Sequence, residues 1–263
     1  MFDLITENYL FILVGLFIGF LALETVAPQN KLSTQTNFRW LVNFSLVSIN
    51  MAITRLAEPF LGILLAVFFT QHSIGLFNQV DLPIAATIFF SILILDLKQY
   101  FFHRASHSLA LVWRVHQIHH SEKELDLTSG YRFHPFEALL SQFFTAILIM
   151  AFGMPVEALL LASLLVHFWN FFTHGNFRIN SKLDQYLQWL IVTPSMHRVH
   201  HSIYHQYFDK NFGNILSVWD RLFGSYVDSR TLNEEALNQF GLPSLQETKG
   251  AGIIQLLAMP FRR

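Results

Sequence analysis

The chain has 263 residues, of which 52% are hydrophobic and only 13% are charged, and its mean hydropathy is +0.39. Soluble domains carry about 25% charged residues, so this composition excludes an ordinary soluble domain and indicates a membrane protein. A net charge of −1 without a basic block excludes a nucleic-acid partner, and the lack of cysteine excludes disulfides, thiolate metal ligands and cysteine-bound iron–sulfur clusters.

The first two apolar stretches, in chain order, differ in length and continuity. A membrane helix needs roughly 20 apolar residues, and residues 10–26 form the first predicted span. The acidic N-terminus and the lack of a small-residue cleavage site favour a retained span over a signal peptide. Residues 41–69 form a longer stretch interrupted by Arg55, Glu58 and Pro59. This stretch is either one long span or an interfacial helix followed by a shorter span.

The next apolar stretches surround the first histidine motif. Residues 82–102 form a strong predicted span that runs directly into the sequence HRASH. Residues 138–152 and 155–172 form an apolar hairpin around a turn at Gly153 and Pro155. Each arm of this hairpin is short for a full crossing, which allows a shallow or tilted hairpin.

Polar residues are concentrated in two regions, 103–137 and from residue 174 to the C-terminus. The predicted fold is therefore an all-α integral membrane protein, arranged as a single membrane domain over residues 1–263. We expect about four transmembrane helices, including the hairpin, and a cytosolic helical cap that holds a histidine-rich site for two metal ions.

The distribution of lysine and arginine predicts the orientation. Lysine and arginine are absent from residues 1–7, from residues 70–81 and from the Gly153 turn, whereas both polar regions contain several of them. Cytoplasmic loops carry an excess of these residues, so the polar regions should face the cytoplasm and His72 the opposite side. A bacterial inner membrane is expected rather than the endoplasmic reticulum, because the chain is compact and lacks an evident retrieval tail.

Three histidine clusters, HRASH, HQIHH and HRVHH, stand out in the polar regions. Residues three and four apart share one face of a helix, so each cluster directs two or three imidazoles at one point. Imidazole is the commonest protein metal ligand. One zinc ion takes three or four protein ligands, so the number of histidines indicates two metal ions in one pocket. The cluster residues are His103, His107, His116, His119, His120, His197, His200 and His201.

Two polar residues precede the first cluster on the same helical face. Asp96 lies seven residues and Tyr100 three residues before His103. An ionisable residue inside an apolar run indicates a functional role, so we expect these side chains to orient an imidazole. The alternative for Asp96 is a tolerated polar group near a helix end. No site role is expected for His72, His167 or His205; His167 is expected to pack or to bond between helices.

Other metal-binding functions fit the clusters less well. Imidazoles suit zinc, copper, iron and nickel, and spacing alone does not choose among them. A metal transporter predicts ligands near the bilayer midplane, whereas these clusters lie beyond the span ends. A membrane cytochrome would place single histidines on separate spans. A zinc-dependent hydrolase acting on lipids stays open.

The three clusters, in this order, resemble the fatty acid hydroxylase and sterol desaturase superfamily of membrane di-iron enzymes. Further motifs strengthen the resemblance: LTSGYRFHPFE at 127–137, FTHGN around His174, and NFGNILSVWDRLFGSY at 211–226. The resemblance covers about residues 96–226, the expected catalytic region. It is specific for the superfamily and does not specify a substrate.

The resemblance implies an iron-dependent oxidoreductase that hydroxylates or desaturates a C–H bond of a lipid, such as a fatty acyl chain or a sterol. Its cofactors would be two Fe ions, with O2 as co-substrate, and a separate reductase with a ferredoxin or cytochrome would supply electrons. The eight cluster histidines carry over as catalytic iron ligands and His174 as a ninth. His134 carries over as a ligand or as support for one. Asn170, where some members have a histidine, would ligate directly or through water.

Overall fold

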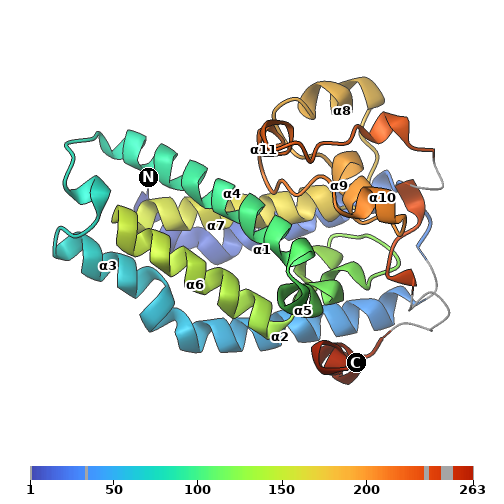
Figure 1. The fold of residues 1–263 in the computed structure, drawn as a ribbon, viewed down its shortest axis with the longest axis horizontal. Helices are drawn as coiled ribbons and strands as arrows, with labels where there is room; N and C mark the ends of the chain where they lie inside the picture. Colours follow the sequence, from blue (N-terminus) through green and yellow to red (C-terminus); the bar gives the residue numbers. More distant parts are fainter. Residues whose placement is uncertain (1, 33–34, 234–236, 244–250, 263) are drawn as a thin grey trace.

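The structure, a computed structural model, consists of a bundle of long helices with shorter helices gathered at one end (Figure 1). Within the part of the chain that it describes, it contains helices and no β-strand, only isolated bridges. This confirms the predicted all-α membrane fold. The described residues are 2–32, 35–233, 237–243 and 251–262.

Five segments of the described chain are long and apolar enough to cross a membrane, against the expected number of about four. Their mean hydropathy ranges from 1.5 to 2.2. The higher number follows from counting both arms of the predicted hairpin beside three preceding spans. The segments are Ile5–Val26, Thr36–Asn78, Ile84–Ser108, Pro135–Phe152 and Val156–His174.

The second apolar stretch forms two consecutive helices, α2 (Thr36–Leu61) and α3 (Ile63–Gln71). Pro59 lies in the last turn of α2, where its ring cannot continue regular helical hydrogen bonding. The Glu58 carboxylate accepts the backbone N–H of Leu64 at 3.1 Å, so it caps the start of α3. The residues that interrupt the apolar pattern therefore divide the stretch into two helices.

The remaining bundle helices are α1 (Phe2–Val26), α4 (Ile84–Ser108), α6 (Pro135–Phe152) and α7 (Val156–His174). Helices α6 and α7 form the predicted hairpin, whose turn has Gly153 at φ 65°. A side chain there would approach the Ile74 carbonyl to 2.5 Å, so glycine is required. Asn78 donates to the Gly153 carbonyl at 3.4 Å. The two lysine-free turns thus meet, at the end of the bundle opposite the cap (Figure 1).

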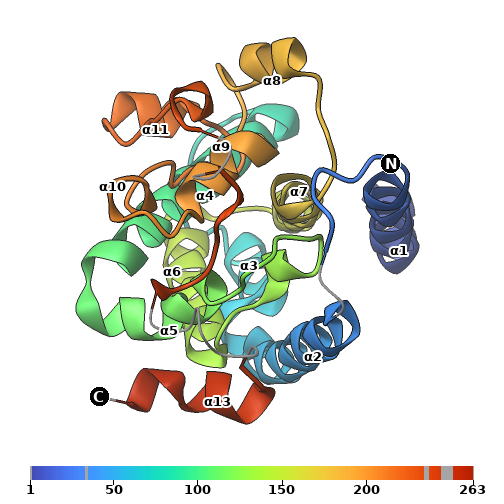
Figure 2. The same cartoon turned by 90° about the vertical axis from the view of Figure 1, so that its right-hand side faces the viewer.

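The cap consists of short helices from both polar regions, and Figure 2 views it along the bundle. Its C-terminal helix packs on α2 through a cluster of Val42, Leu46, Ile118 and Leu256. The cap elements are α5 (Ala110–His120), η2 (Ser129–Tyr131), α8 (Ser181–Leu187), α9 (Pro194–His200), α10 (His205–Phe208), α11 (Val218–Leu222), η3 (Ser229–Thr231), α13 (Ile253–Ala258) and η5 (Met259–Phe261), with η1 (Leu76–Asn78) at the opposite end.

A buried ion network fastens the loop after α5 to the bundle. Arg39 of α2 contacts the carboxylates of Glu122 at 2.9 Å, Glu124 at 2.6 Å and Asp126 at 2.8 Å. Arg39 is 8% exposed, so its charge depends on these partners rather than on water. The network fixes the start of the segment that leads from the second histidine cluster into α6.

Replacing Arg39 with Met should lower the free energy of unfolding by roughly 3–5 kcal/mol, because it leaves the buried Asp126 carboxylate without its cation and removes one of the two cations that contact Glu122. The midpoint of thermal unfolding in detergent measures this loss. Arg55→Met, on the exposed side of the same helix, is the matched control. Equal midpoints for the two variants would contradict a structural role for the network.

Candidate metal centre

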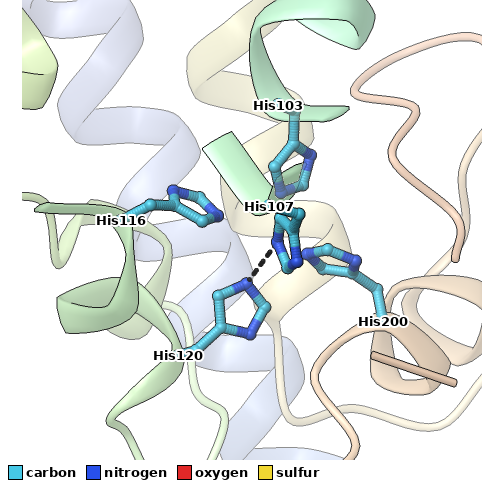
Figure 3. Close-up of side chains that lie close together, drawn as sticks. All are labelled: His103, His107, His116, His120 and His200. Carbon is cyan, nitrogen blue, oxygen red and sulfur yellow. Dashed lines mark hydrogen bonds between the residues drawn. The ribbon is translucent and has the colours of Figure 1, made fainter. Parts of the chain in front are cut away.

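Nine histidines from four helices converge where the bundle meets the cap. They form two groups, and within each group one ring nitrogen per residue lies within 4.8 Å of the others. Figure 3 shows the first group, with rings from α4, α5 and α9 directed at one another. Group one is His103, His107, His116, His120 and His200; group two is His119, His174, His197 and His201.

The third cluster is positioned by the start of α9. Thr193 is the N-cap residue, and its hydroxyl oxygen accepts the N–H of Met196 at 3.4 Å. Pro194 occupies the first helical turn, where its fixed φ favours helix initiation. A helix that begins here turns His197 and His201, four residues apart, toward the same group, while His200 joins the other.

Backbone carbonyls fix the tautomer of three of these rings. A carbonyl oxygen only accepts hydrogen bonds, so the Nδ1 that contacts it carries the hydrogen and Nε2 keeps a free lone pair. This tautomer can bind a metal ion through the Nε2 lone pair. The pairs are His103 with the Phe212 carbonyl (2.9 Å), His200 with that of Lys210 (2.8 Å) and His174 with that of Asn170 (3.1 Å).

Two carboxylates fix two further rings. Glu137 Oε1 accepts from His116 Nδ1 at 2.6 Å, with both side chains buried. Asp209 Oδ1 accepts from His107 Nδ1 at 3.2 Å, and the Asp209 side chain is 52% exposed. Carboxylates that bond to the far nitrogen of a metal-binding histidine set its orientation and raise its basicity.

The inward nitrogens lack ordinary partners. In group one, Nε2 of His103 and of His200 is buried without a hydrogen-bond partner in the described part of the chain. In group two, His174 Nε2 lies 3.3 Å from that of His119 and 3.0 Å from that of His197. Converging lone pairs repel one another, and a buried nitrogen without a hydrogen-bond partner costs free energy. A cation bound in each group would remove the repulsion and give these nitrogens a partner. The all-imidazole donor set fits iron, zinc, copper or nickel.

Burial keeps these rings in the neutral, metal-binding form. Desolvation, followed by the neighbouring histidines, lowers the pKa of His119, His120 and His201 well below its usual value. The pKa values of His197 and His200 are lowered in the same way. These five rings therefore favour the neutral form, in which imidazole accepts a cation.

The two groups lie against each other. The rings of His120 and His201, one from each group, stack with their centroids 4.5 Å apart. His116 and His119, also from different groups, have centroids 5.5 Å apart. Such contact fits the predicted arrangement of two ions in one pocket.

Asp96 and Tyr100 contact a different part of the chain from the one expected. Asp96 accepts the backbone N–H groups of Ile215 at 3.0 Å and Leu216 at 3.2 Å, and the indole N–H of Trp219 at 2.8 Å. The Tyr100 hydroxyl bonds to a serine of the same cap segment, Ser225, at 2.8 Å. Instead of bonding to an imidazole, both residues fasten residues 211–226 to α4, and this segment supplies the Phe212 carbonyl to His103.

The remaining predicted residues lie outside both groups. His134 caps α6 by accepting the Phe136 N–H at Nδ1, at 3.1 Å, and its Nε2 contacts the Leu257 carbonyl at 3.3 Å. Both ring nitrogens of His134 therefore have partners outside the metal centre. The side chain of Asn170 lines the cavity next to His174.

The three histidines given no site role also lie outside the groups. His72 bonds to the Phe68 carbonyl in the distant turn, at 2.8 Å. His167 makes the expected hydrogen bond between elements, to the Tyr131 hydroxyl at 2.8 Å. His205 begins the short helix α10.

Sequence reasoning missed Glu137 and Asp209. Glu137 had a usable signal, since it is an ionisable residue at the start of an apolar helix, within the motif that also contains His134. Asp209 lies in a polar region and had no such signal. The carbonyl partners carry no side-chain signal at all.

An apolar cavity of about 720 Å³ leads to the histidines between α1, α2, α4, α6 and α7. Histidines of both groups line its inner end, among them His103 and His119. Leu10 of α1 and Met51 of α2 line the cavity and are also 69% and 67% exposed. The cavity therefore opens between α1 and α2, on the flank of the bundle.

Replacing Glu137 with Ala should weaken metal binding about 10–100-fold, because His116 loses the acceptor that sets its tautomer. Competition with a chelator, followed by metal analysis, measures this change. Glu137→Gln keeps an acceptor oxygen and should retain most of the affinity. Glu157→Ala, at the opposite end of the hairpin, is the control, and equal metal retention in Glu137→Ala would contradict the role of this carboxylate.

Comparisons with known proteins agree with the histidine pattern. Among similar proteins, alkylglycerol monooxygenase of Xenopus tropicalis is 32% identical over 143 residues, which cover 51% of this chain and 29% of the relative. Ornithine lipid hydroxylase OlsE of Rhizobium tropici is 26% identical over 216 residues, covering 82% and 60%. Human lathosterol oxidase is 29% identical over 153 residues, covering 58% and 47%.

The chain spans less than two thirds of the length of each of these relatives. No solved structure matches it. The family model for fatty acid hydroxylase matches residues 88–225, which include all three histidine clusters and His174. The match covers more than half of the sequence, and the chain belongs to the fatty acid hydroxylase family.

Proposed function

We propose that this chain is a membrane oxidoreductase that uses two iron ions and dioxygen to hydroxylate or desaturate a C–H bond of a lipid. The observation that carries the proposal is the position of the two histidine groups at the inner end of a long apolar cavity. Family membership and the names of the relatives, a monooxygenase, a hydroxylase and an oxidase, support the class of reaction.

In this proposal the two histidine groups bind metal and the cavity binds lipid. Groups one and two would each hold one iron ion, and bound iron supplies the activation of dioxygen that side chains cannot provide. Histidines of both groups face the cavity, so a carbon at its inner end lies beside the metal-binding nitrogens. The protein then contributes the position of that carbon, since a correctly held reactant removes much of the entropic barrier.

The apolar wall also excludes water from the reaction. Leu13, Phe17 and Val47 belong to this apolar wall. A lipid that enters from the bilayer fills this space and replaces solvent around the reacting carbon. The opening between α1 and α2 faces the side of the bundle, which supports direct entry from the membrane.

Electrons would come from a separate reductase with a ferredoxin or cytochrome. His107 of group one bonds to the half-exposed Asp209, so this contact connects group one to the cap surface. We place the cap on the cytoplasmic side of the membrane on the strength of its lysines and arginines, and we prefer a bacterial inner membrane. Exposed basic cap residues such as Arg230 support this orientation.

Metal analysis of the purified full-length protein tests the proposal. We expect about two iron ions per chain, because nine histidines exceed the three or four ligands of one ion. Reductant-dependent oxygen consumption should require this iron, and His119→Ala should lose metal and activity. His72→Ala, in the distant turn, is the matched control and should retain both.

Stoichiometric zinc, with activity independent of dioxygen, would favour a zinc-dependent lipid hydrolase and contradict the proposal. Metal uptake into vesicles without lipid oxidation would favour a transporter. Lipid profiles of cells with and without the gene identify the substrate class, and unchanged profiles together with iron-free protein would rule out lipid oxidation.

A further inference from the structure

One face of α7 carries polar residues that lead along the cavity toward the metal centre. Ser163, His167, Asn170 and His174 follow one another at spacings of four, three and four residues, which places them on one side of the helix. His174 belongs to group two. The other three extend this polar face away from the metal centre, toward the far end of the bundle.

Tyr131 completes this face from outside α7. Its hydroxyl lies 2.8 Å from His167 Nδ1, and the two rings stack with centroids 5.6 Å apart. Both side chains line the cavity. The preceding Gly130 is packed so tightly that a Cβ would come within 2.9 Å of His174 Nδ1. This close packing fixes Tyr131 relative to the metal centre.

The Tyr131–His167 pair has unused hydrogen-bonding capacity. Imidazole has two polar nitrogens, and only Nδ1 of His167 has a partner among the described residues. The Asn170 side-chain amide, between this pair and His174, also has none there. Polar groups left facing an apolar cavity cost free energy, and a polar group on a bound lipid would recover it.

The lack of a free charge in the described lining of the cavity restricts the chemical class of the polar group that can bind there. No lysine or arginine belongs to the described lining, and its one carboxylate, Glu137, is bonded to His116. Lys98 donates to Ser141 of the lining at 2.7 Å but does not itself line the cavity. A carboxylate or phosphate inside would be desolvated without a cation, whereas a hydroxyl needs only hydrogen bonds.

We propose that Tyr131 and His167 bind the hydroxyl group of an uncharged lipid, an inference that rests on the proposed function and names its substrate class. His167 lies seven residues from His174, which is about 10 Å along the helix. The hydroxyl therefore sits two helical turns from the metal centre. The oxidised carbon is remote from the hydroxyl-bearing carbon rather than next to it.

Binding of three probes of equal chain length tests the subsite: hexadecanol, hexadecane and palmitate, each with the purified full-length protein in nanodiscs. We expect hexadecanol to bind most tightly. Tyr131→Phe should weaken hexadecanol binding about 2–10-fold, the range of a typical hydrogen bond, and leave hexadecane binding unchanged. His167→Phe, a second variant that keeps the ring volume, should act in the same way. Tyr186→Phe, at a side chain that is 74% exposed on α8, is the control.

Two results would overturn the subsite. One is an unchanged preference for hexadecanol in both Tyr131→Phe and His167→Phe. The other is tightest binding of palmitate that Lys98→Met abolishes, which would assign an anion site to Lys98.

Metal content, measured on the same samples, separates the two proposals. Normal iron with either of these results contradicts the hydroxyl subsite alone. Iron-free protein that still selects hexadecanol through Tyr131 supports the subsite and contradicts the oxidase.

Discussion

The structure depends on the direction of imidazole lone pairs. Five of the nine histidines bond outward through Nδ1 to a carbonyl or carboxylate, which leaves Nε2 as a base directed inward. Such an arrangement is unfavourable for an empty protein core and favourable for one that holds cations. The hydrogen-bond acceptors that determine which ring nitrogen keeps its lone pair lie mostly on loops rather than on the helices that carry the rings. The need to position these acceptors explains why the surrounding loops are held by so many bonds.

The ion pairs and caps of the membrane-facing bundle can be understood from this requirement. Arg39 holds the loop after α5, and Asp96 holds the segment that contains the Phe212 carbonyl. Glu24 of α1 accepts backbone N–H groups from Leu127 at 2.7 Å and from Asn176 at 2.6 Å, so it joins two cap loops to the first helix. Each of these buried side chains lies at the base of the cap, where the cost of burial is offset by more than one bond to the cap loops.

Local spacing predicted that the histidines converge, because helical periodicity places residues three and four apart near one face. The residues four apart do share a group, whereas those three apart, such as His116 and His119, belong to different groups, so each cluster does not point at a single site. The hairpin and the spans followed from hydropathy in the same way. Asp96 was assigned the wrong partner because its hydrogen-bond donors lie 119 to 123 residues later in the chain, and spacing on one helix says nothing about such contacts. The predicted motif around His134 contained a residue that supports an imidazole, but it was Glu137, since the proline after His134 starts a helix and makes the histidine its cap.

The flank opening between α1 and α2 has a kinetic consequence. Phe17 and Phe44, one from each helix, meet edge to face across it with centroids 6.1 Å apart. Under the proposed function, a lipid substrate that passes this aromatic pair would come from a two-dimensional solution, so the relevant concentration would be its mole fraction in the bilayer rather than its amount in water. Turnover should then rise with the mole fraction of substrate in the membrane and fall when other lipids dilute it. A product made more polar by oxidation would return to the same leaflet through the same flank opening.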